Sequence, residues 1–253
     1  MASIQEIFQR FGKKYSEEKI LGNLQKKVIR AISNCRTSIM GTLMKICGHC
    51  GYEEVTYCSC RNRHCPKCQT YAKEKWITKR KSEIINTSYF HVVFTIPDEL
   101  RDITLFNKDK MYNILFKAVS ETLKSLGMDE KWLGAEIGAM LILHTWTQTM
   151  LFHPHIHAVV PSGGITKNGF WKSGGKKFFI PVKILGKVFR GKFMYYFLKE
   201  LENGNLYLPG ELSTLNIEEH LKPFRIELYK KNWYVYCKRT FNGPEAVIEY
   251  LGR

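Results

Sequence analysis

The residues best suited to chemistry are cysteines, and most of the eight lie between Cys35 and Cys68. Cys47 with Cys50 and Cys65 with Cys68 form two Cys-x-x-Cys pairs, separated by fourteen residues. Two such pairs hold one ion tetrahedrally, at roughly 2.3 Å from each sulfur. The pattern predicts a structural zinc site, since a redox-active pair needs a single motif ahead of a helix.

Other potential ligands in the same segment leave the number of sites open. Cys58, Cys60, His49 and His64 are surplus to a four-ligand site. Cys60 and His64 could complete a second site, or Cys60 could replace one of the four ligands. We expect Cys35 to pack as a small buried thiol.

Histidines form the second group. Residues two apart on a strand point to one face, so His155 and His157 would project together and converge on a cation. A third ligand could come from Gln148, His153 or His144. The alternative is a hydrogen-bonded histidine pair on a half-buried strand. The pattern predicts a second metal site, distinct from the cysteine module.

Hydrophobic periodicity indicates the elements that position these groups. We expect an α+β protein with a small α-rich metal-binding module over residues 1–85 and a largely antiparallel sheet flanked by helices over residues 86–253. The predicted helices are residues 3–34, broken around Gly12 and Gly22, and residues 72–85, 107–126, 183–201, 215–221 and 244–251. The predicted strands are residues 89–96, 139–146, 155–160 and 224–238, and residues 168–177 read as a loop.

The charge points to a polyanionic partner. Thirty-nine Lys and Arg against 23 Asp and Glu give a formal net charge of +16, and nucleic acid is the commonest partner of so basic a chain. An anionic membrane is less favoured, because the charge is not gathered on one amphipathic helix. The sequence shows neither a secretion signal nor a membrane-spanning run, so we expect a soluble, cytoplasmic protein.

Seven segments together resemble one family. They are Ser59–Gln69 (SCRNRHCPKCQ), Tyr89–Pro97 (YFHVVFTIP), His144–Trp146, His153–His157, Pro181–Lys183, Phe189–Phe193 and Tyr250–Arg253. In this order the chain resembles the HUH-class (His-hydrophobic-His) two-tyrosine transposases of bacterial insertion sequences, which carry an N-terminal zinc-binding domain and are thought to move by rolling-circle replication. The resemblance implies an HUH-endonuclease-like sheet and a nucleoid-associated bacterial protein.

The resemblance also implies a reaction. Tyr250 would attack single-stranded DNA at the ends of a transposable element, leaving a 5′-phosphotyrosine and a free 3′-OH. His155 and His157 would hold Mg²⁺ or Mn²⁺, although imidazoles also accept Zn²⁺. The family places a second tyrosine four residues further on, beyond Arg253, where the sequence ends. We therefore expect a chain cut off after its first nucleophile, in which nicking could survive but strand transfer by two alternating tyrosines could not.

Two readings compete with a nuclease. One is a non-catalytic, zinc-containing DNA-binding remnant or regulator of a transposable element, and the other is a zinc hydrolase of small substrates. Further DNA contacts are expected from Arg190 and Lys192, which would meet phosphate, from the loop at 172–177, and from Phe170 and Trp171, which would stack on bases.

Overall fold

The computed structural model describes every residue except 1–2, 148, 150, 175–179, 241–242 and 253. The chain forms two compact units, one ending at Ser82 and the other running from Glu83 to Leu251. The predicted domain boundary after residue 85 stays a prediction. Among the described residues, no helix combines the length and apolar character needed to cross a membrane.

A helix pair, α1 (Ile4–Glu18) and α2 (Asn23–Asn34), opens the first unit. Helix α1 begins with a capping box, in which Ser3 Oγ accepts from Glu6 N and Glu6 Oε2 accepts from Ser3 N. The expected break at Gly12 is wrong, because α1 continues through it. A Cβ at Gly12 would lie 3.0 Å from Ile29, so this glycine instead lets the two helices approach closely.

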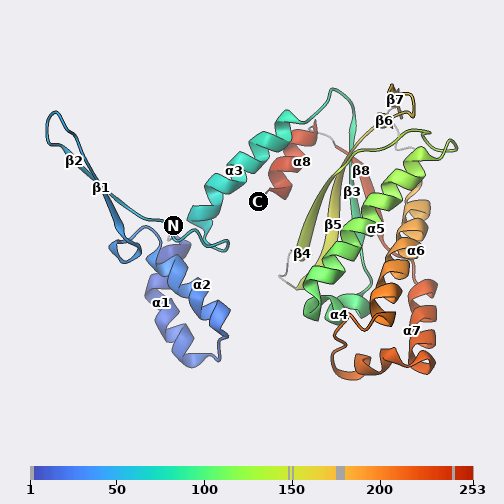
Figure 1. The fold of residues 1–253 in the computed structure, drawn as a ribbon, viewed down its shortest axis with the longest axis horizontal. Coiled ribbons are helices and arrows are strands. Elements are labelled where there is room, and N and C mark those ends of the chain that lie inside the picture. The colour runs from blue at the N-terminus through green and yellow to red at the C-terminus, as the bar shows by residue number, and fades with distance from the viewer. Residues whose placement is uncertain (1–2, 148, 150, 175–179, 241–242, 253) are drawn as a thin grey trace. The chain divides into compact units, whose positions relative to one another are not determined.

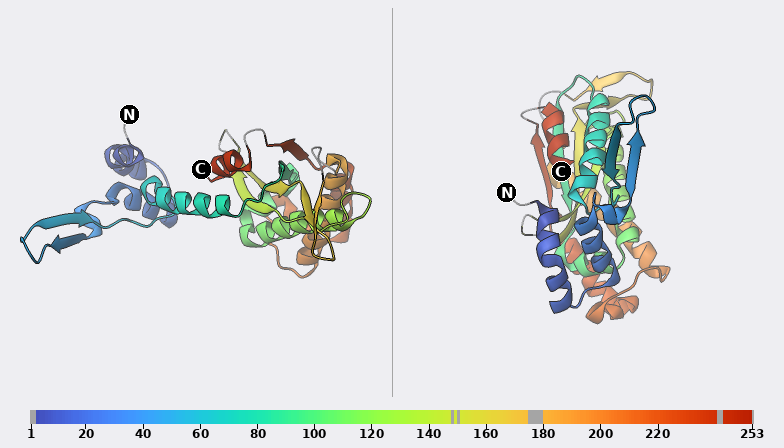
Figure 2. Two further views of the ribbon diagram at one scale, coloured as in Figure 1. Left: turned by 90° about the horizontal axis from the view of Figure 1, so that it is seen from above. Right: turned by 90° about the vertical axis from the view of Figure 1, so that its left-hand side faces the viewer.

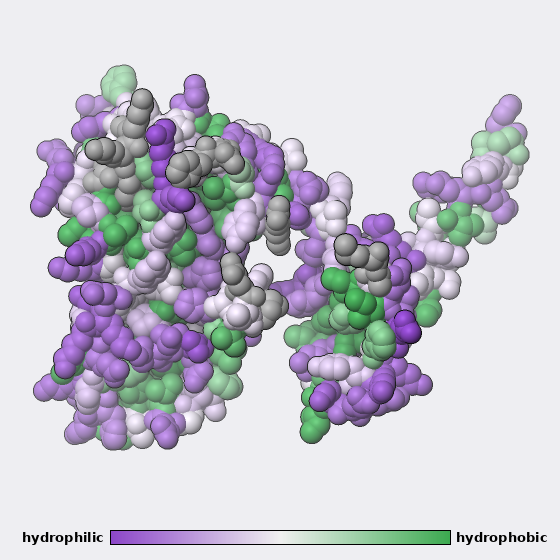
Figure 3. Space-filling model, turned by 180° about the vertical axis from the view of Figure 1, so that it is seen from behind, coloured by the Kyte–Doolittle hydropathy of each residue, from purple (hydrophilic) through white to green (hydrophobic). Residues whose placement is uncertain are grey.

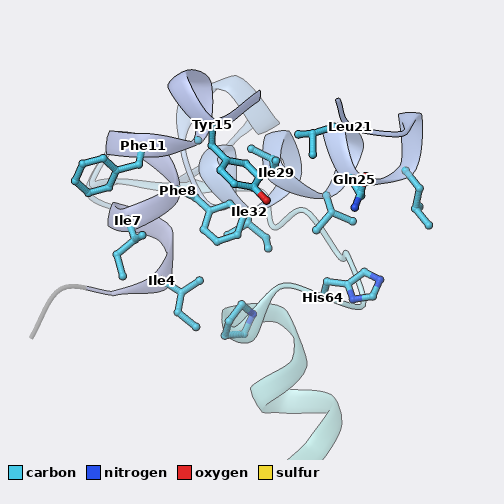
Figure 4. A pocket seen from close by; sticks show the side chains of 14 residues that line it. Ile4, Ile7, Phe8, Phe11, Tyr15, Leu21, Gln25, Ile29, Ile32 and His64 are labelled. Carbon is cyan, nitrogen blue, oxygen red and sulfur yellow. The ribbon is translucent and has the colours of Figure 1, made fainter. Parts of the chain in front are cut away.

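The apolar sides of these two helices form a groove of about 810 Å³ (Figure 4). Ile7, Phe8 and Phe11 face it from α1, and Ile29 and Ile32 face it from α2. Figure 3 shows apolar side chains gathered on this part of the surface. The first unit therefore rests on a small, open apolar contact rather than on an enclosed core.

The metal-binding segment forms a hairpin and a long helix. A short 3₁₀ turn, η1 (Ser38–Met40), leads into β1 (Thr42–Ile46), which pairs antiparallel with β2 (Glu53–Tyr57). Every residue of both strands is exposed. Helix α3 (Pro66–Ser82) follows and starts six residues earlier than expected, with Pro66 in the first turn, where a missing N–H costs no hydrogen bond.

A four-stranded antiparallel sheet forms the centre of the second unit, in the order β4-β5-β3-β8 (Figure 1). Its strands are β3 (Tyr89–Thr95), β4 (Met140–Trp146), β5 (Phe152–Pro161) and β8 (Val235–Arg239). The antiparallel sheet flanked by helices confirms the predicted α+β class. A small separate hairpin joins β6 (Gly163–Ile165) to β7 (Trp171–Ser173).

Helices pack on the sheet (Figures 1 and 2). They are η2 (Asp98–Leu100), α4 (Arg101–Phe106), α5 (Lys108–Met128), α6 (Val182–Glu202), η3 (Gly210–Asn216), α7 (Glu218–Lys230) and α8 (Gly243–Leu251). Strand residues such as Phe94 and Ile156 point into one core with Leu115 of α5 and Phe189 of α6. This core therefore covers one face of the sheet, and the intervening residues of each strand point to the opposite face.

The strand predicted over residues 224–238 is wrong in its first half, which belongs to α7. Leu221 and Leu228, seven residues apart, are buried on one helical face. Trp233 follows the end of the helix and its Nε1 donates a hydrogen bond back to Leu228 O. Strand β8 then begins at Val235.

Candidate metal centres

Three histidines converge on the face of the sheet opposite the main core. Along β5, Ile156 points into the core, and His155 and His157 alternate to the other face. His144 on β4 stands directly opposite His155 in register. The ligand nitrogens of His144, His155 and His157 all lie within 4.8 Å of one another. We call these three residues the histidine cluster.

Hydrogen bonds to the Nδ1 atoms orient two of the imidazoles. His155 Nδ1 lies 2.6 Å from the carbonyl oxygen of His153, so it must carry the proton that it donates. His157 Nδ1 lies 2.7 Å from Nε2 of His91, and the two rings are stacked. When His157 donates to His91, Nε2 of both cluster residues keeps a free lone pair for a cation.

The cluster is held in the neutral form that binds metal. Burial, reinforced by the neighbouring His144 and His155, lowers the pKa of His157 to about 3. Burial also lowers the pKa of His155 and of His144, although a hydrogen bond with the Leu251 backbone partly offsets the shift for His144. Three neutral imidazoles within reach of one point make a donor set that fits a divalent cation.

Of the other predicted ligands of this site, His153 is described and does not belong to the cluster. His153 is beside His155, but its Nδ1 lies 3.8 Å from an Asp98 oxygen and it is not in the cluster. Gln148 lies outside the described residues. The sequence analysis missed His91, because its contact with His157 depends on the pairing of β3 with β5. The only sequence feature that could have indicated His91 is its place in the two-residue alternation of a predicted strand.

The helix that carries Tyr250 packs on the same face as the histidine cluster. Leu251 is buried against Tyr89 and Val159, whose side chains alternate along their strands to the same face as the histidines. The Tyr250 side chain is 56% exposed. The end of α8 therefore packs on the face that carries the cluster, with its tyrosine open to a large ligand.

In the first unit, four cysteines gather at the start of α3. The Sγ atoms of Cys35, Cys60, Cys65 and Cys68 lie within 4.8 Å of one another, and we call them the cysteine cluster. Burial raises the pKa of Cys68, but hydrogen bonds from Cys35, Cys60 and Cys65 outweigh it and lower that pKa to about 7. Four thiols at this separation suit a tetrahedral zinc ion.

This cluster differs in two members from the set that the Cys-x-x-Cys spacing predicts. Cys47 and Cys50 are exposed in the turn between β1 and β2. The base of that hairpin is anchored beside the cluster, where Arg36 N donates to Cys58 O. Because each strand of the hairpin spans five extended residues, the turn lies about 17 Å from this base. Cys35, which the sequence predicts only as a buried thiol, belongs to the cysteine cluster.

Two of the residues expected to contact DNA lie away from the histidine face. Arg190 and Lys192 belong to α6, on the core face of the sheet. Arg190 donates to the carbonyls of Tyr229 and Lys231, and Lys192 pairs with Glu121. Trp171 is in β7 and covers Gly163, where a Cβ would lie 2.4 Å from the indole. The loop at 172–177 falls partly outside the described residues.

Comparison with known proteins gives two family matches and two relatives. Residues 7–96 match a family model described as "Transposase zinc-binding domain", and residues 138–253 match one described as "Putative transposase". The chain is 40% identical to "Putative transposase y4qJ" of Sinorhizobium fredii over 99% of its own length and 63% of that protein. It is 27% identical to "Transposase for insertion sequence element IS801" of Pseudomonas savastanoi pv. phaseolicola, over 94% and 56% respectively. The chain thus spans about six tenths of the length of these relatives.

Among solved structures, the chain is similar to the conjugative relaxase TrwC in complex with oriT DNA, in its metal-bound structure. The TM-score is 0.36 with 13% identity, over 66% of this chain and 64% of that one. TrwC complexed with a 27-mer DNA comprising the recognition hairpin and the cleavage site gives a TM-score of 0.36 and 15% identity, over 64% and 65%.

Proposed function

The chain belongs to the insertion-sequence transposases that carry a zinc-binding domain, and we propose that it nicks single-stranded DNA at the ends of a transposable element. One observation carries the proposal: the histidine cluster and the helix bearing Tyr250 occupy the same face of the sheet, where Leu251 packs against Val159, two residues beyond His157 on β5. A nucleophile and a cation site must share a face to act on one phosphate.

In the proposed reaction, Tyr250 Oη attacks the scissile phosphorus while the bond from phosphorus to the 3′-oxygen breaks. The phenolic proton passes to solvent and the leaving 3′-oxygen takes up a proton from solvent, so the products are a 5′-phosphotyrosine and a free 3′-OH. A divalent cation, when bound, would polarise the phosphate and offset the charge that develops on its oxygens. His144, His155 and His157 would hold this ion, and the packing of Leu251 on Tyr89 and Val159 would keep the end of α8 on the same face.

Two different ions fit the two centres. We propose a structural zinc ion at the cysteine cluster, since thiolates in tetrahedral sets select zinc. At the histidine cluster we propose Mg²⁺ or Mn²⁺ for turnover. Of these two ions, Mn²⁺ suits three imidazole ligands better, because Mg²⁺ demands oxygen ligands more strictly than Mn²⁺ does.

The experiment is a covalent-adduct assay. The protein is incubated with Mn²⁺ and a labelled single strand from the ends of its own element, and adducts are resolved by denaturing electrophoresis. The parent and Tyr195→Phe, a control on the exposed face of α6, should form the adduct, and Tyr250→Phe should not. An adduct that persists in Tyr250→Phe would refute this nucleophile. DNA binding with no adduct in the parent would select a non-catalytic binding protein instead.

A further inference from the structure

Exposed aromatic side chains flank the histidine cluster on its own face of the sheet. On β4, Trp146 follows His144 by two residues and its ring lies parallel to that imidazole, with centroids 5.8 Å apart. On the far side, Tyr236 of β8 stands opposite Val93, and Thr95 N donates to Tyr234 O. Trp146, Tyr234 and Tyr236 are 51%, 63% and 39% exposed. We call these three residues the aromatic track.

The register places the track on both sides of the cluster. Val93 and Thr95 pair with His157 and His155, so their partners on β8 belong to the histidine-bearing face. The two ends of the track are three strand spacings apart, about 14 Å. An extended chain of a few monomers could therefore cross the face and touch both ends.

The β8 end of the track is hollowed. A pocket of about 280 Å³ is lined by Tyr234, Thr95 and His153, among others. The two acidic groups in its wall are paired with cations, Asp98 with Arg101 and Glu99 with Lys231. Lys238 stands opposite His91 on the same face and brings a further positive charge. This pocket thus combines an exposed tyrosine with acidic groups that are paired with cations.

Planar rings beside a phosphate-directed site fit unpaired nucleobases. Aromatic side chains stack on the π-face of any base, whereas the bases of a duplex are already stacked on one another. We propose that a single-stranded nucleic acid crosses this face, with bases stacked on Trp146 at one side of the histidine cluster and on Tyr234 and Tyr236 at the other. This inference rests on the proposed function and assigns the surface that would present the phosphate to the cluster.

Binding of a fluorescein-labelled oligothymidylate, followed by anisotropy, tests the track. Removing one stacking platform should weaken the complex about 5- to 100-fold, so Trp146→Ala and Tyr236→Ala should each lose affinity in this range. The control Tyr195→Ala removes an equally exposed aromatic from α6 and should bind as the parent does. Affinity for the duplex with oligoadenylate should be lower in the parent and insensitive to Trp146→Ala.

A second readout separates stacking from a structural role. Trp146→Phe keeps a ring and should retain most of the affinity, but it should lose the part of the tryptophan fluorescence quenching that the oligonucleotide causes at Trp146. Parent-like affinity in the double variant Trp146→Ala/Tyr236→Ala would overturn the track and leave the nicking proposal intact. Absence of any single-strand binding by the parent would overturn both.

Discussion

The two clusters in this chain show opposite relations between a metal site and the fold around it. The cysteine cluster is assembled by a loop and the start of α3, and the buried core beside it consists of Ile32, Cys35 and Cys65. The histidine cluster is placed by two paired strands whose other face is held by an extensive core. The first site therefore has little packing around it, whereas the second is positioned by the sheet and its core.

Loss of a cysteine should therefore have the largest effect. Cys60→Ala should remove zinc and unfold the first unit, because a structural zinc site supplies about 10–16 kcal/mol of folding free energy in small domains. Limited proteolysis and zinc content measured by mass spectrometry would follow the change, and the second unit should remain resistant.

Cys47→Ala is the matched control for Cys60→Ala. Cys47 is exposed in the hairpin turn and outside the cysteine cluster, so this variant should keep its zinc and its resistance to protease. Equal loss of zinc in both variants would favour the ligand set that the sequence spacing predicts over the cysteine cluster.

The same contrast explains what the sequence could predict. His155 and His157 follow from the two-residue period of a strand, and Cys65 with Cys68 from a turn that is local in the chain. Cys35 and His91 could not be found this way, because each meets its partners only through tertiary contacts: Cys35 at the end of α2, and His91 through the pairing of β3 with β5. Local spacing identifies ligands that share an element, and it is silent about the rest.

At the histidine cluster, the next largest effect should come from the residue behind the ligands. His91→Leu removes the hydrogen-bond partner of His157 Nδ1 and should lower Mn²⁺ affinity about 10- to 100-fold, as loss of an outer hydrogen bond to a metal ligand typically does. Calorimetric titration with Mn²⁺ would measure it.

Two further variants sharpen the test of His91. His91→Gln keeps a hydrogen-bonding group and should recover part of the affinity. His220→Leu changes an exposed histidine on α7 and should leave the Mn²⁺ affinity unchanged. If His91→Leu binds Mn²⁺ as the parent does, His157 does not depend on this contact for its orientation.

Preorganised neutral imidazoles should also make the metal-free second unit sensitive to acid. The pKa of His157 is about 3 in the fold, below its ordinary 6.5. Between these values the unfolded chain binds a proton that the folded chain does not, so stability is complete above pH 6.5 and falls as the pH drops towards 3. Urea unfolding at pH 7 and pH 5 should show a lower midpoint at pH 5. A His155→Gln/His157→Gln variant should show a smaller drop; an equal drop would place the sensitivity elsewhere.

The smallest effect should be at Arg190, which lies on α6 and therefore on the core face of the sheet. Arg190 Nη1 donates to Tyr229 O at 2.6 Å and to Lys231 O at 3.1 Å, so it satisfies carbonyls at the end of α7. Arg190→Gln should cost about 1–2 kcal/mol of unfolding free energy, as loss of hydrogen bonds from a charged donor does, and leave oligothymidylate affinity unchanged. Denaturant titration and anisotropy would measure the two quantities on the same samples. Unchanged stability with weakened binding would instead identify a phosphate contact, and the DNA path would then have to reach the helical side of the sheet.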